Sequence, residues 1–322
     1  MFNVDIQGEK ITIRNYQEGD EATIVPFLKE TFGKQWTIEY WEWKYKQNPC
    51  GFFIFVAYNS RKELIGHIAL QTKKGVYQGT ECNFVYACDS IVKKEYRGNG
   101  ISSLFIRLLP KNVVVFGFQN KIAMTVTKKY EREYSSSLHF CQIPIFNKTI
   151  SITQRFRTFI SKKIFSPLFE IKKLTENDLC ILDALWEEKK DEITEGAVRN
   201  KNYALWRHYL NQNHMPIYSV YEKNKCIGYF SFLQKGPACY ITDILLLNNS
   251  VSTHLISEIE NVALTLHTNN IKIMGTDATI QRTLLHSEYV HQDNITASIA
   301  VLTTEKREPV SPYLTYTDTD LF

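Results

Sequence analysis

The sequence predicts an α/β (α+β) fold, and two observations carry that prediction. A strand ending in Asp89–Val92 is followed by a polar loop, a short helix from Ile101 and a second strand from Val113 to Phe118. The same strand–loop–helix–strand order returns between residues 240 and 274. Strands that alternate with helices at this spacing indicate α/β units with parallel neighbouring strands.

The helix that begins at Ile101 is predicted from its apolar stripe. Apolar residues recur there at helical spacing, and they are Ile101, Leu104, Phe105, Leu108 and Leu109. Pro110 then ends the helix. Gly98 and Gly100 precede it, and glycine adopts backbone conformations that side chains forbid. The loop 93–100 therefore presents unpaired backbone N–H groups at a helix N-terminus, which suits a phosphate-bearing ligand.

Composition limits the class of protein. The 322 residues are 44% hydrophobic and 22% charged, as is typical of one or two globular domains. The net charge of +4 is small for this length and predicts no nucleic-acid partner. The seven cysteines form no Cys-x-x-Cys pair, which favours free thiols in a reducing compartment. Because the sequence shows neither a signal sequence nor a long apolar run, we expect a cytoplasmic protein.

A second pattern predicts an internal repeat. The aromatic and basic segment 40–45 is matched by the segment 203–208, about 163 positions later. An Ile-Gly pair follows each segment, at residues 65–66 and 227–228. The second half lacks the glycine loop, because residues 248–252 contain neither glycine nor arginine. We therefore expect two domains of similar size, 1–150 and 173–322, of which only the first keeps the ligand loop.

A basic segment, 151–172, separates the predicted domains. Its apolar residues recur at helical spacing and predict a cationic amphipathic helix over 152–165; they are Ile152, Phe156, Phe159, Ile160 and Ile164. We interpret this helix as a linker that packs on a domain. The alternative interpretation is contact with a membrane surface.

The loop sequence also carries a family resemblance. Arg97-Gly98-Asn99-Gly100-Ile101-Ser102 resembles the Arg/Gln-x-x-Gly-x-Gly/Ala acetyl-CoA loop of the GNAT acetyltransferase superfamily. The string 89–101 is similar to a GNAT subgroup that reads Asp-x-x-x-x-Pro-x-Tyr-Arg-Gly-x-Gly-Ile, and residues 117–120 are similar to its Gly-Phe-Pro-Asn. Lys94 stands where that subgroup has proline, and Ser102 replaces the last small residue. The resemblance covers residues 9–147 and, with the repeat, implies two tandem GNAT-like domains, each a mixed sheet flanked by helices.

This resemblance implies acetyl-CoA as the cosubstrate, and the spacing of the histidines predicts no metal site. In GNAT folds the pyrophosphate meets backbone N–H groups, which here belong to Arg97, Gly98, Asn99, Gly100, Ile101 and Ser102. The pantetheine arm lies between two diverging strands and uses backbone groups that correspond to Ile91 and Val92. Asn120, at the end of the second strand, is implied to bind the cofactor arm or to position the thioester.

Acetyl transfer to an amine needs a route for the amine proton and a proton for the leaving thiolate. Asp89 is the candidate general base because it lies on the cofactor strand just before Ile91; the alternative is a structural carboxylate, which the matching Asp243 favours. The resemblance implies a tyrosine as general acid, with Tyr130 and Tyr134 as candidates. We interpret Cys88 and the aromatic residues at 41–45 as core, and no histidine has metal-ligand spacing.

Together these features predict an N-acetyltransferase. It would move acetyl from acetyl-CoA to a primary amine of a small acceptor by direct transfer in a ternary complex, and the family resemblance suggests an amino sugar. Two other classes stay open. A FemABX-like aminoacyltransferase also has tandem GNAT-like domains, but the glycine loop and the modest charge argue against it. An acyl-CoA sensor would bind acetyl-CoA without turnover.

Overall fold

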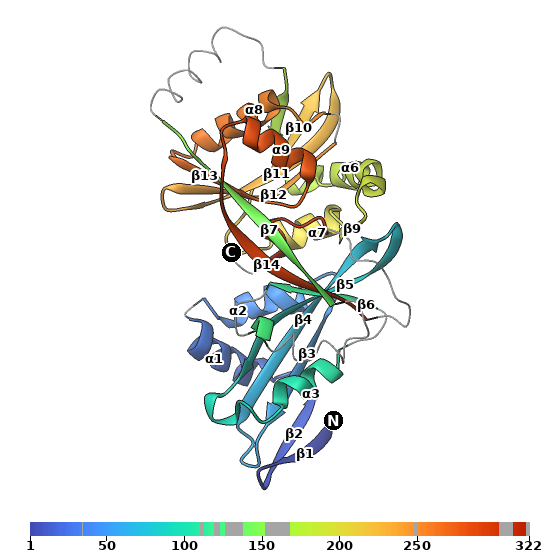
Figure 1. The fold of residues 1–322 in the computed structure, drawn as a ribbon, viewed down its shortest axis with the longest axis vertical. Helices are drawn as coiled ribbons and strands as arrows, with labels where there is room; N and C mark the ends of the chain where they lie inside the picture. The colour runs from blue at the N-terminus through green and yellow to red at the C-terminus, as the bar shows by residue number, and fades with distance from the viewer. Residues whose placement is uncertain are drawn as a thin grey trace. The chain divides into compact units, whose positions relative to one another are not determined.

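A computed structural model describes residues 1–33, 35–109, 113–118, 123–125, 138–151, 168–247, 250–302 and 312–319. The chain divides into two compact units, whose elements are labelled in Figure 1. Unit 1 comprises residues 1–75, 81–141 and 297–309, and unit 2 comprises 76–80, 142–296 and 310–322. Each unit contains a mixed β-sheet flanked by helices, so the predicted fold class is confirmed.

The sheet of unit 1 contains the predicted strand–loop–helix–strand segment. In spatial order its strands are β1 (Phe2–Ile6), β2 (Glu9–Asn15), β3 (Phe52–Tyr58), β4 (Leu64–Tyr77), β5 (Thr80–Val92), β6 (Val113–Phe118) and the C-terminal part of β14 (Val290–Leu302). β5 and β6 run parallel, and α3 connects them along the chain. β14 pairs antiparallel with β6, from Ala297 opposite Phe118 to Leu302 opposite Val113.

Helical segments lie on both faces of this sheet (Figure 1). They are α1 (Glu21–Phe32), α2 (Ile38–Trp41), the π-helix η1 (Glu42–Lys46), the 3-10 turn η2 (Lys94–Tyr96) and α3 (Ile101–Arg107). Side chains of β4 alternate between the faces. A Cβ on Gly66 would lie 3.2 to 3.3 Å from α3 side chains. Gln71, five residues further along β4, points to the other face, where its Nε2 donates to the Lys44 carbonyl of η1 at 3.2 Å. The glycine loop helix and η1 therefore lie on opposite faces.

The apolar stripe of α3 faces the core as predicted. Ile101, Phe105 and Leu109 are buried among strand residues of unit 1, while Leu104 and Leu108 pack at the margin of the same cluster. Gly66 on β4 allows this close packing, because a side chain there would press against α3. The helix is thereby fixed on the sheet, and its first turn is held at the end of β5.

Unit 2 repeats this plan. In spatial order its strands are β14, β7 (Leu138–Thr149), β13 (Asn270–Met274), β12 (Ala238–Leu246), β11 (Lys225–Lys235), β10 (Ile217–Glu222) and β8 (Glu170–Lys173), with β9 (Glu195–Ala197) off this path. Its helical segments are η3 (Glu176–Asp178), α6 (Ile181–Lys189), η4 (Lys190–Glu192), α7 (Lys201–Ala204), the π-helix η5 (Leu205–Tyr209), α8 (Thr253–Leu264), α9 (Ala278–His286) and η7 (Tyr316–Asp318). β12 and β13 run parallel, as β5 and β6 do.

The predicted repeat is present in the backbone. α2 and α7, and likewise the π-helices η1 and η5, begin and end at residues offset by 163 positions. The residues before α2 and α7 act alike: Thr37 accepts a hydrogen bond from the Tyr40 N–H, and Asn200 accepts one from the Tyr203 N–H. Because side-chain caps of this kind fix where a helix begins, both copies enter their π-helix from the same start.

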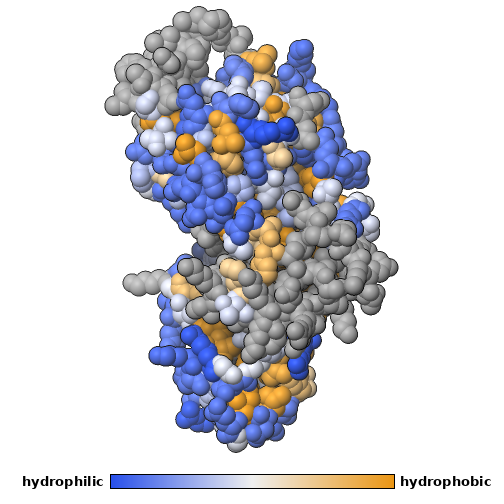
Figure 2. All heavy atoms as spheres, viewed as in Figure 1, coloured by the Kyte–Doolittle hydropathy of each residue, from blue (hydrophilic) through white to orange (hydrophobic). Residues whose placement is uncertain are grey.

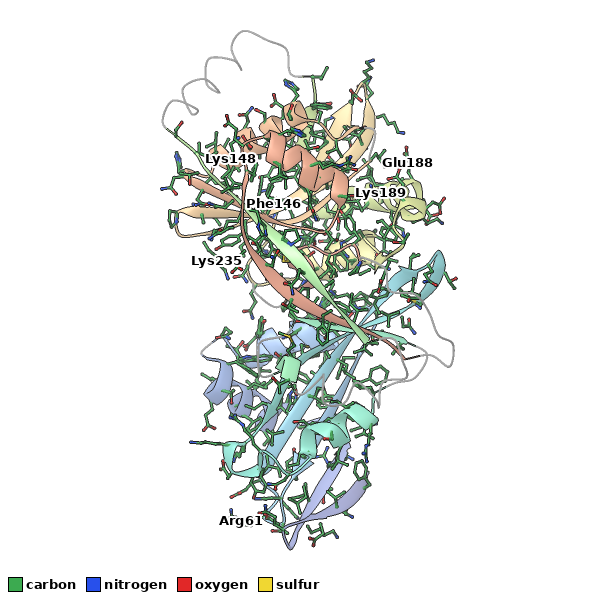
Figure 3. All side chains as sticks on the ribbon, viewed as in Figure 1. Arg61, Phe146, Lys148, Glu188, Lys189 and Lys235 are labelled. Atoms are coloured by element: carbon green, nitrogen blue, oxygen red, sulfur yellow. The ribbon has the colours of Figure 1, made fainter. Side chains whose placement is uncertain are left out.

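The strands β7 and β14 are each divided between the two units along the sequence. Residues 142–149 of β7 belong to unit 2, where residues 145–149 pair with β13, whereas residues 297–302 of β14 belong to unit 1 and pair with β6. Lys148 on β7 is anchored inside unit 2, where its Nζ lies 2.9 Å from Glu260 Oε1 and 2.8 Å from the Ser287 carbonyl oxygen (Figure 3). The residue ranges of the two compact units therefore alternate along the sequence, whereas the predicted domains 1–150 and 173–322 are contiguous. The predicted domain boundaries stay predictions.

The predicted linker helix, residues 152–165, falls outside the described residues. β8 begins at Glu170, inside the predicted linker 151–172. On the face shown in Figure 2 the coloured surface is mainly hydrophilic, with apolar side chains in small patches. The described helices include none that is long and apolar enough to cross a membrane.

Candidate active site

The glycine loop lies between the end of β5 and the start of α3, as predicted. Gly98 and Gly100 have φ angles of +81° and +83°, in the left-handed region that favours glycine. A Cβ on either residue would meet no atom within 4 Å. Gly100 occupies the N-cap position of α3 without a side-chain hydrogen bond. The loop thus presents backbone to open space, which is the setting that a phosphate-bearing ligand needs.

Side-chain hydrogen bonds hold the loop in place. Arg97 donates from Nε to the Val92 carbonyl at 2.9 Å, which ties the loop to the end of β5. Tyr96 donates from its hydroxyl to Glu9 Oε2 at 3.1 Å, and Asn99 accepts from Gln7 Nε2 at 2.9 Å. These bonds connect the loop to β2 and to the turn between β1 and β2. They fix the loop conformation without covering its glycines.

β5 and β6 diverge beyond the middle of β5. Their paired residues run from Phe84 opposite Val114 to Tyr86 opposite Phe116, whereas β5 itself continues to Val92. Among the described residues no further pair joins these strands toward Ile91. The use of the backbone near Ile91 and Val92 by a pantetheine arm stays a prediction.

Asp89 lies on this diverging part of β5 and has an unusual backbone conformation. Its φ of +49° is in the left-handed region, which aspartate tolerates better than most side chains. The Lys44 Nζ lies 2.7 Å from Asp89 Oδ2, and the Tyr45 hydroxyl donates to the same oxygen. His67 donates from Nδ1 to the Asp89 carbonyl oxygen at 2.8 Å. Two residues of η1 and one of β4 thus hold Asp89 by both its side chain and its backbone.

This cluster is nearly closed to water. The Lys44 side chain is 1% exposed and that of Asp89 is 10% exposed. The Lys44 ammonium also lies 4.9 Å from the centre of the Trp36 ring, close enough for a cation–π contact. Burial lowers the pKa of His67, although its hydrogen bond to Asp89 opposes that effect. His67 is therefore neutral at pH 7, and its buried Nε2 has no hydrogen-bond partner.

Three of these residues were not predicted as parts of the site. Tyr45 was assigned to the core, and Lys44 and His67 were given no role. The sequence signal for Tyr45 and Lys44 is the repeated aromatic and basic segment, which lies on a π-helix in both copies. π-helical turns occur often at functional sites, but they are not readable from sequence. The position of His67 opposite Asp89 depends on strand pairing and has no local signal.

The remaining predicted site residues divide into two groups. Ile91, Val92, Asp89 and the residues 97–102 all lie in unit 1 around the end of β5. Asn120, Tyr130 and Tyr134 fall outside the described residues. In the part of the chain that the structure describes, no group of three or more His, Cys, Asp or Glu side chains is arranged to hold a metal ion.

The helix of the second copy that corresponds to α3 begins with a side-chain cap. α8 begins after Ser252, whose hydroxyl accepts a hydrogen bond from the Leu255 N–H. One of the free N–H groups at this helix start is therefore already satisfied, whereas Gly100 offers α3 no such cap. The sequence prediction that the second copy carries no glycine loop agrees with this difference.

Comparison with known proteins identifies the family. Residues 18–132 match the model of the acetyltransferase (GNAT) family. Residues 18–132 are therefore a GNAT-family domain. No curated protein matches it by sequence. Enzymes of the GNAT family are acyltransferases that take their acyl group from acyl-CoA, and this match assigns residues 18–132 to that class.

Solved structures extend the likeness to both GNAT copies. A probable N-acyltransferase from Enterococcus faecalis V583 is 11% identical with a TM-score of 0.65, covering 91% of this chain and 73% of that one. Saccharomyces cerevisiae N-myristoyltransferase with bound myristoyl-CoA is 10% identical with a TM-score of 0.56, covering 90% and 82%. The glucosamine N-acetyltransferase region of a fungal β-N-acetylglucosaminidase is 8% identical with a TM-score of 0.58, covering 90% and 38%. At these identities the likeness shows a shared fold.

Proposed function

We propose that unit 1 transfers an acetyl group from acetyl-CoA to a primary amine of a small acceptor. The observation that carries this proposal is the open glycine loop beside diverging strands: Gly98 and Gly100 turn left-handed backbone toward empty space, and β5 extends past its last pair with β6. A loop of this kind binds diphosphates through main-chain N–H groups.

In this proposal the backbone of residues 97–102 holds the diphosphate of CoA. Backbone groups near Ile91 and Val92 hold the pantetheine arm, and Asn120 assists at the end of β6. Acetyl-CoA supplies an activated acyl group as a thioester. Arg97 is exposed and uses Nε to close the loop, so its guanidinium lies at the loop surface where a phosphate would bind.

Asp89 is the proposed general base for the acceptor amine. Its carboxylate lies on the η1 face of β5, and both of its side-chain contacts fall on Oδ2. Lys44 and Tyr45 keep the carboxylate in one orientation, which is the kind of positioning that direct transfer in a ternary complex depends on. Tyr130 and Tyr134 remain the proposed donors of a proton to the leaving thiolate.

We propose an amino sugar as the first acceptor class to test. A solved structure with the same fold is described as a glucosamine N-acetyltransferase region, while another holds myristoyl-CoA. The acyl chain is therefore tested together with the acceptor: acetyl-CoA, octanoyl-CoA and myristoyl-CoA are each offered with a panel of amines, and released CoA thiol is measured. Release of thiol with acetyl-CoA and an amino sugar is the expected result.

The cofactor site itself is tested by Gly100→Val. A valine in the left-handed region is strained, and its branched side chain would fill the space beside the loop. We expect acetyl-CoA affinity to fall at least 100-fold by calorimetry, on the order of 3 kcal/mol. Gly79→Val is the matched control, because Gly79 has a φ of +75° and equally empty surroundings in the β4–β5 turn.

Equal acetyl-CoA affinity in both glycine variants and the unmodified chain would contradict the loop assignment. Tight acetyl-CoA binding by the unmodified chain without turnover on any amine would instead favour an acyl-CoA sensor.

A further inference from the structure

Unit 2 contains a strand divergence that corresponds to the one in unit 1. β12 and β13 pair from Ala238 opposite Asn270 to Ile241 opposite Ile273, and β12 then continues to Leu246. In unit 1 the matching divergence is where the pantetheine arm is proposed to bind. In unit 2 the C-terminal segment Pro312–Thr319, here called the tail, contacts the residues that follow β13 and the end of β12.

Hydrogen bonds join the tail to both diverging strands. On the β13 side, Thr276 donates its N–H to the Leu314 carbonyl at 3.3 Å, and Leu314 donates its N–H to Thr276 Oγ1 at 2.9 Å. On the β12 side, Thr315 donates from Oγ1 to Asp243 Oδ1 at 2.8 Å, and the Tyr313 hydroxyl donates to the Ile244 carbonyl. The tail therefore bridges the two strands where they no longer pair.

Two buried arginines anchor the end of the tail. Arg199 forms an ion pair with Asp318 and lies 3.3 Å from Asp243 through Nε. Arg207 donates from Nε to the Thr317 carbonyl at 2.8 Å and from Nη2 to the Thr319 carbonyl. Both arginines are almost fully buried. Arginines that are buried this completely need their partners, so the tail is an integral part of unit 2.

We propose that the tail is a built-in peptide occupant of the second cofactor opening. Its residues 312–315 fill the place that unit 1 leaves for the pantetheine arm, and Asp318 in the 3-10 turn that follows pairs with the buried Arg199. Each chain therefore binds one acyl-CoA, through unit 1. The count of one acyl-CoA per chain rests on the proposed function. The docking of the tail rests only on the contacts within unit 2.

Hydrogen–deuterium exchange of the full chain, with and without saturating acetyl-CoA, tests the proposal. We expect the amides of Tyr313, Leu314 and Thr276 to be protected in both conditions, because acetyl-CoA does not displace the tail. Residues 97–102 should gain protection only with acetyl-CoA. Native mass spectrometry should find one acetyl-CoA per chain. A second bound acetyl-CoA, or loss of tail protection when it binds, would overturn the proposal.

Two variants examine the anchor. Asp318→Asn removes the charge that pairs with Arg199, and exchange at Leu314 and Thr276 should become at least tenfold faster. Asp293→Asn is the matched control, because Asp293 is exposed on β14, and it should leave exchange unchanged. Unchanged exchange in Asp318→Asn would contradict the anchor. Failure of acetyl-CoA to protect residues 97–102, with the tail still protected, would contradict the proposed function and leave the tail assignment intact.

Discussion

Units 1 and 2 place an aspartate at the same point of the repeat but surround it differently. Asp89 receives Lys44 and Tyr45 on one carboxylate oxygen and stays 10% exposed. Asp243 is fully buried, and its carboxylate accepts hydrogen bonds from the Tyr229 hydroxyl at 2.8 Å and from Thr315 at 2.8 Å. Both units thus hold a carboxylate against a π-helix, and the carboxylate keeps some exposure in unit 1 but is fully buried in unit 2.

The partners of the two aspartates come from matching places. Tyr45 on η1 corresponds to His208 on η5, and each lies against its aspartate. His67 follows Gly66 and Tyr229 follows Gly228, and each contacts the aspartate of its own unit. Arg199 and the tail have no counterpart among the described contacts of Asp89. What differs is therefore the added anchor and tail, which close unit 2.

The largest expected effect separates the two roles of Asp89. Asp89→Asn should lower kcat by about 100-fold or more with little change in acetyl-CoA affinity, because removing a general base typically costs that much. Steady-state kinetics and calorimetry measure the two quantities.

The same substitution also leaves the buried Lys44 without its partner, so a control is needed. Lys44→Met breaks the same ion pair but keeps the carboxylate. If both variants lose activity equally, Asp89 is a positioning residue like Asp243. If only Asp89→Asn is inactive, the carboxylate itself takes the proton.

The second prediction concerns Asp243 and stability. Asp243→Ala removes one of the two carboxylates that pair with the buried Arg199 and the acceptor of the Tyr229 hydroxyl, so the free energy of unfolding should fall by about 3–5 kcal/mol. Burial would raise the pKa of Asp243, but Arg199, His208 and Thr315 outweigh burial and hold it below its usual value. The ionised Asp243 therefore stabilises the fold at pH values above the ordinary pKa of aspartate, and this stabilisation is lost as the pH falls toward the lowered pKa of the folded state. Denaturant titration at pH 7 and pH 3 measures both effects, and a loss under 1 kcal/mol at pH 7 would contradict them.

Sequence reasoning reached the parts of this comparison that depend on local patterns. The stripe of α3 and the left-handed glycines follow from spacing within a few residues, and the repeat follows from the likeness of two short segments, 40–45 and 203–208. Other features join residues that are far apart in sequence: the division of β7 and β14 between the units, the contact of the tail with Asp243, and the contact of His67 with Asp89. No local pattern records such pairings, because they depend on which strands become neighbours.

The third prediction concerns a carboxyl group next to the tail. Glu195 on β9 is fully buried, neither carboxyl oxygen has a hydrogen-bond partner, and burial raises its pKa to about 8. The folded state therefore keeps a proton that the unfolded state loses above about pH 4.5. Stability should fall by up to about 1.4 kcal/mol per pH unit as pH rises between these values, and then level off.

Glu195→Gln tests this pH dependence directly, because glutamine has nearly the same shape and does not ionise. Denaturant titrations from pH 5 to pH 9 should show the slope in the unmodified chain and a smaller slope in the variant. Identical slopes would mean that Glu195 is already ionised or has a partner in solution.

The smallest expected effect compares the two glycines of the repeat. A Cβ on Gly228 would lie 2.5 Å from the Leu245 carbonyl oxygen, which belongs to a buried strand, whereas a Cβ on Gly66 would lie 3.2 Å or more from side chains that can shift. Gly228→Ala should therefore cost about 1–3 kcal/mol of unfolding free energy, as overpacking does, and Gly66→Ala less than about 1 kcal/mol. Thermal and denaturant unfolding measure the difference. Equal losses of unfolding free energy would mean that the packing around Gly228 is no tighter than the packing of α3 on Gly66.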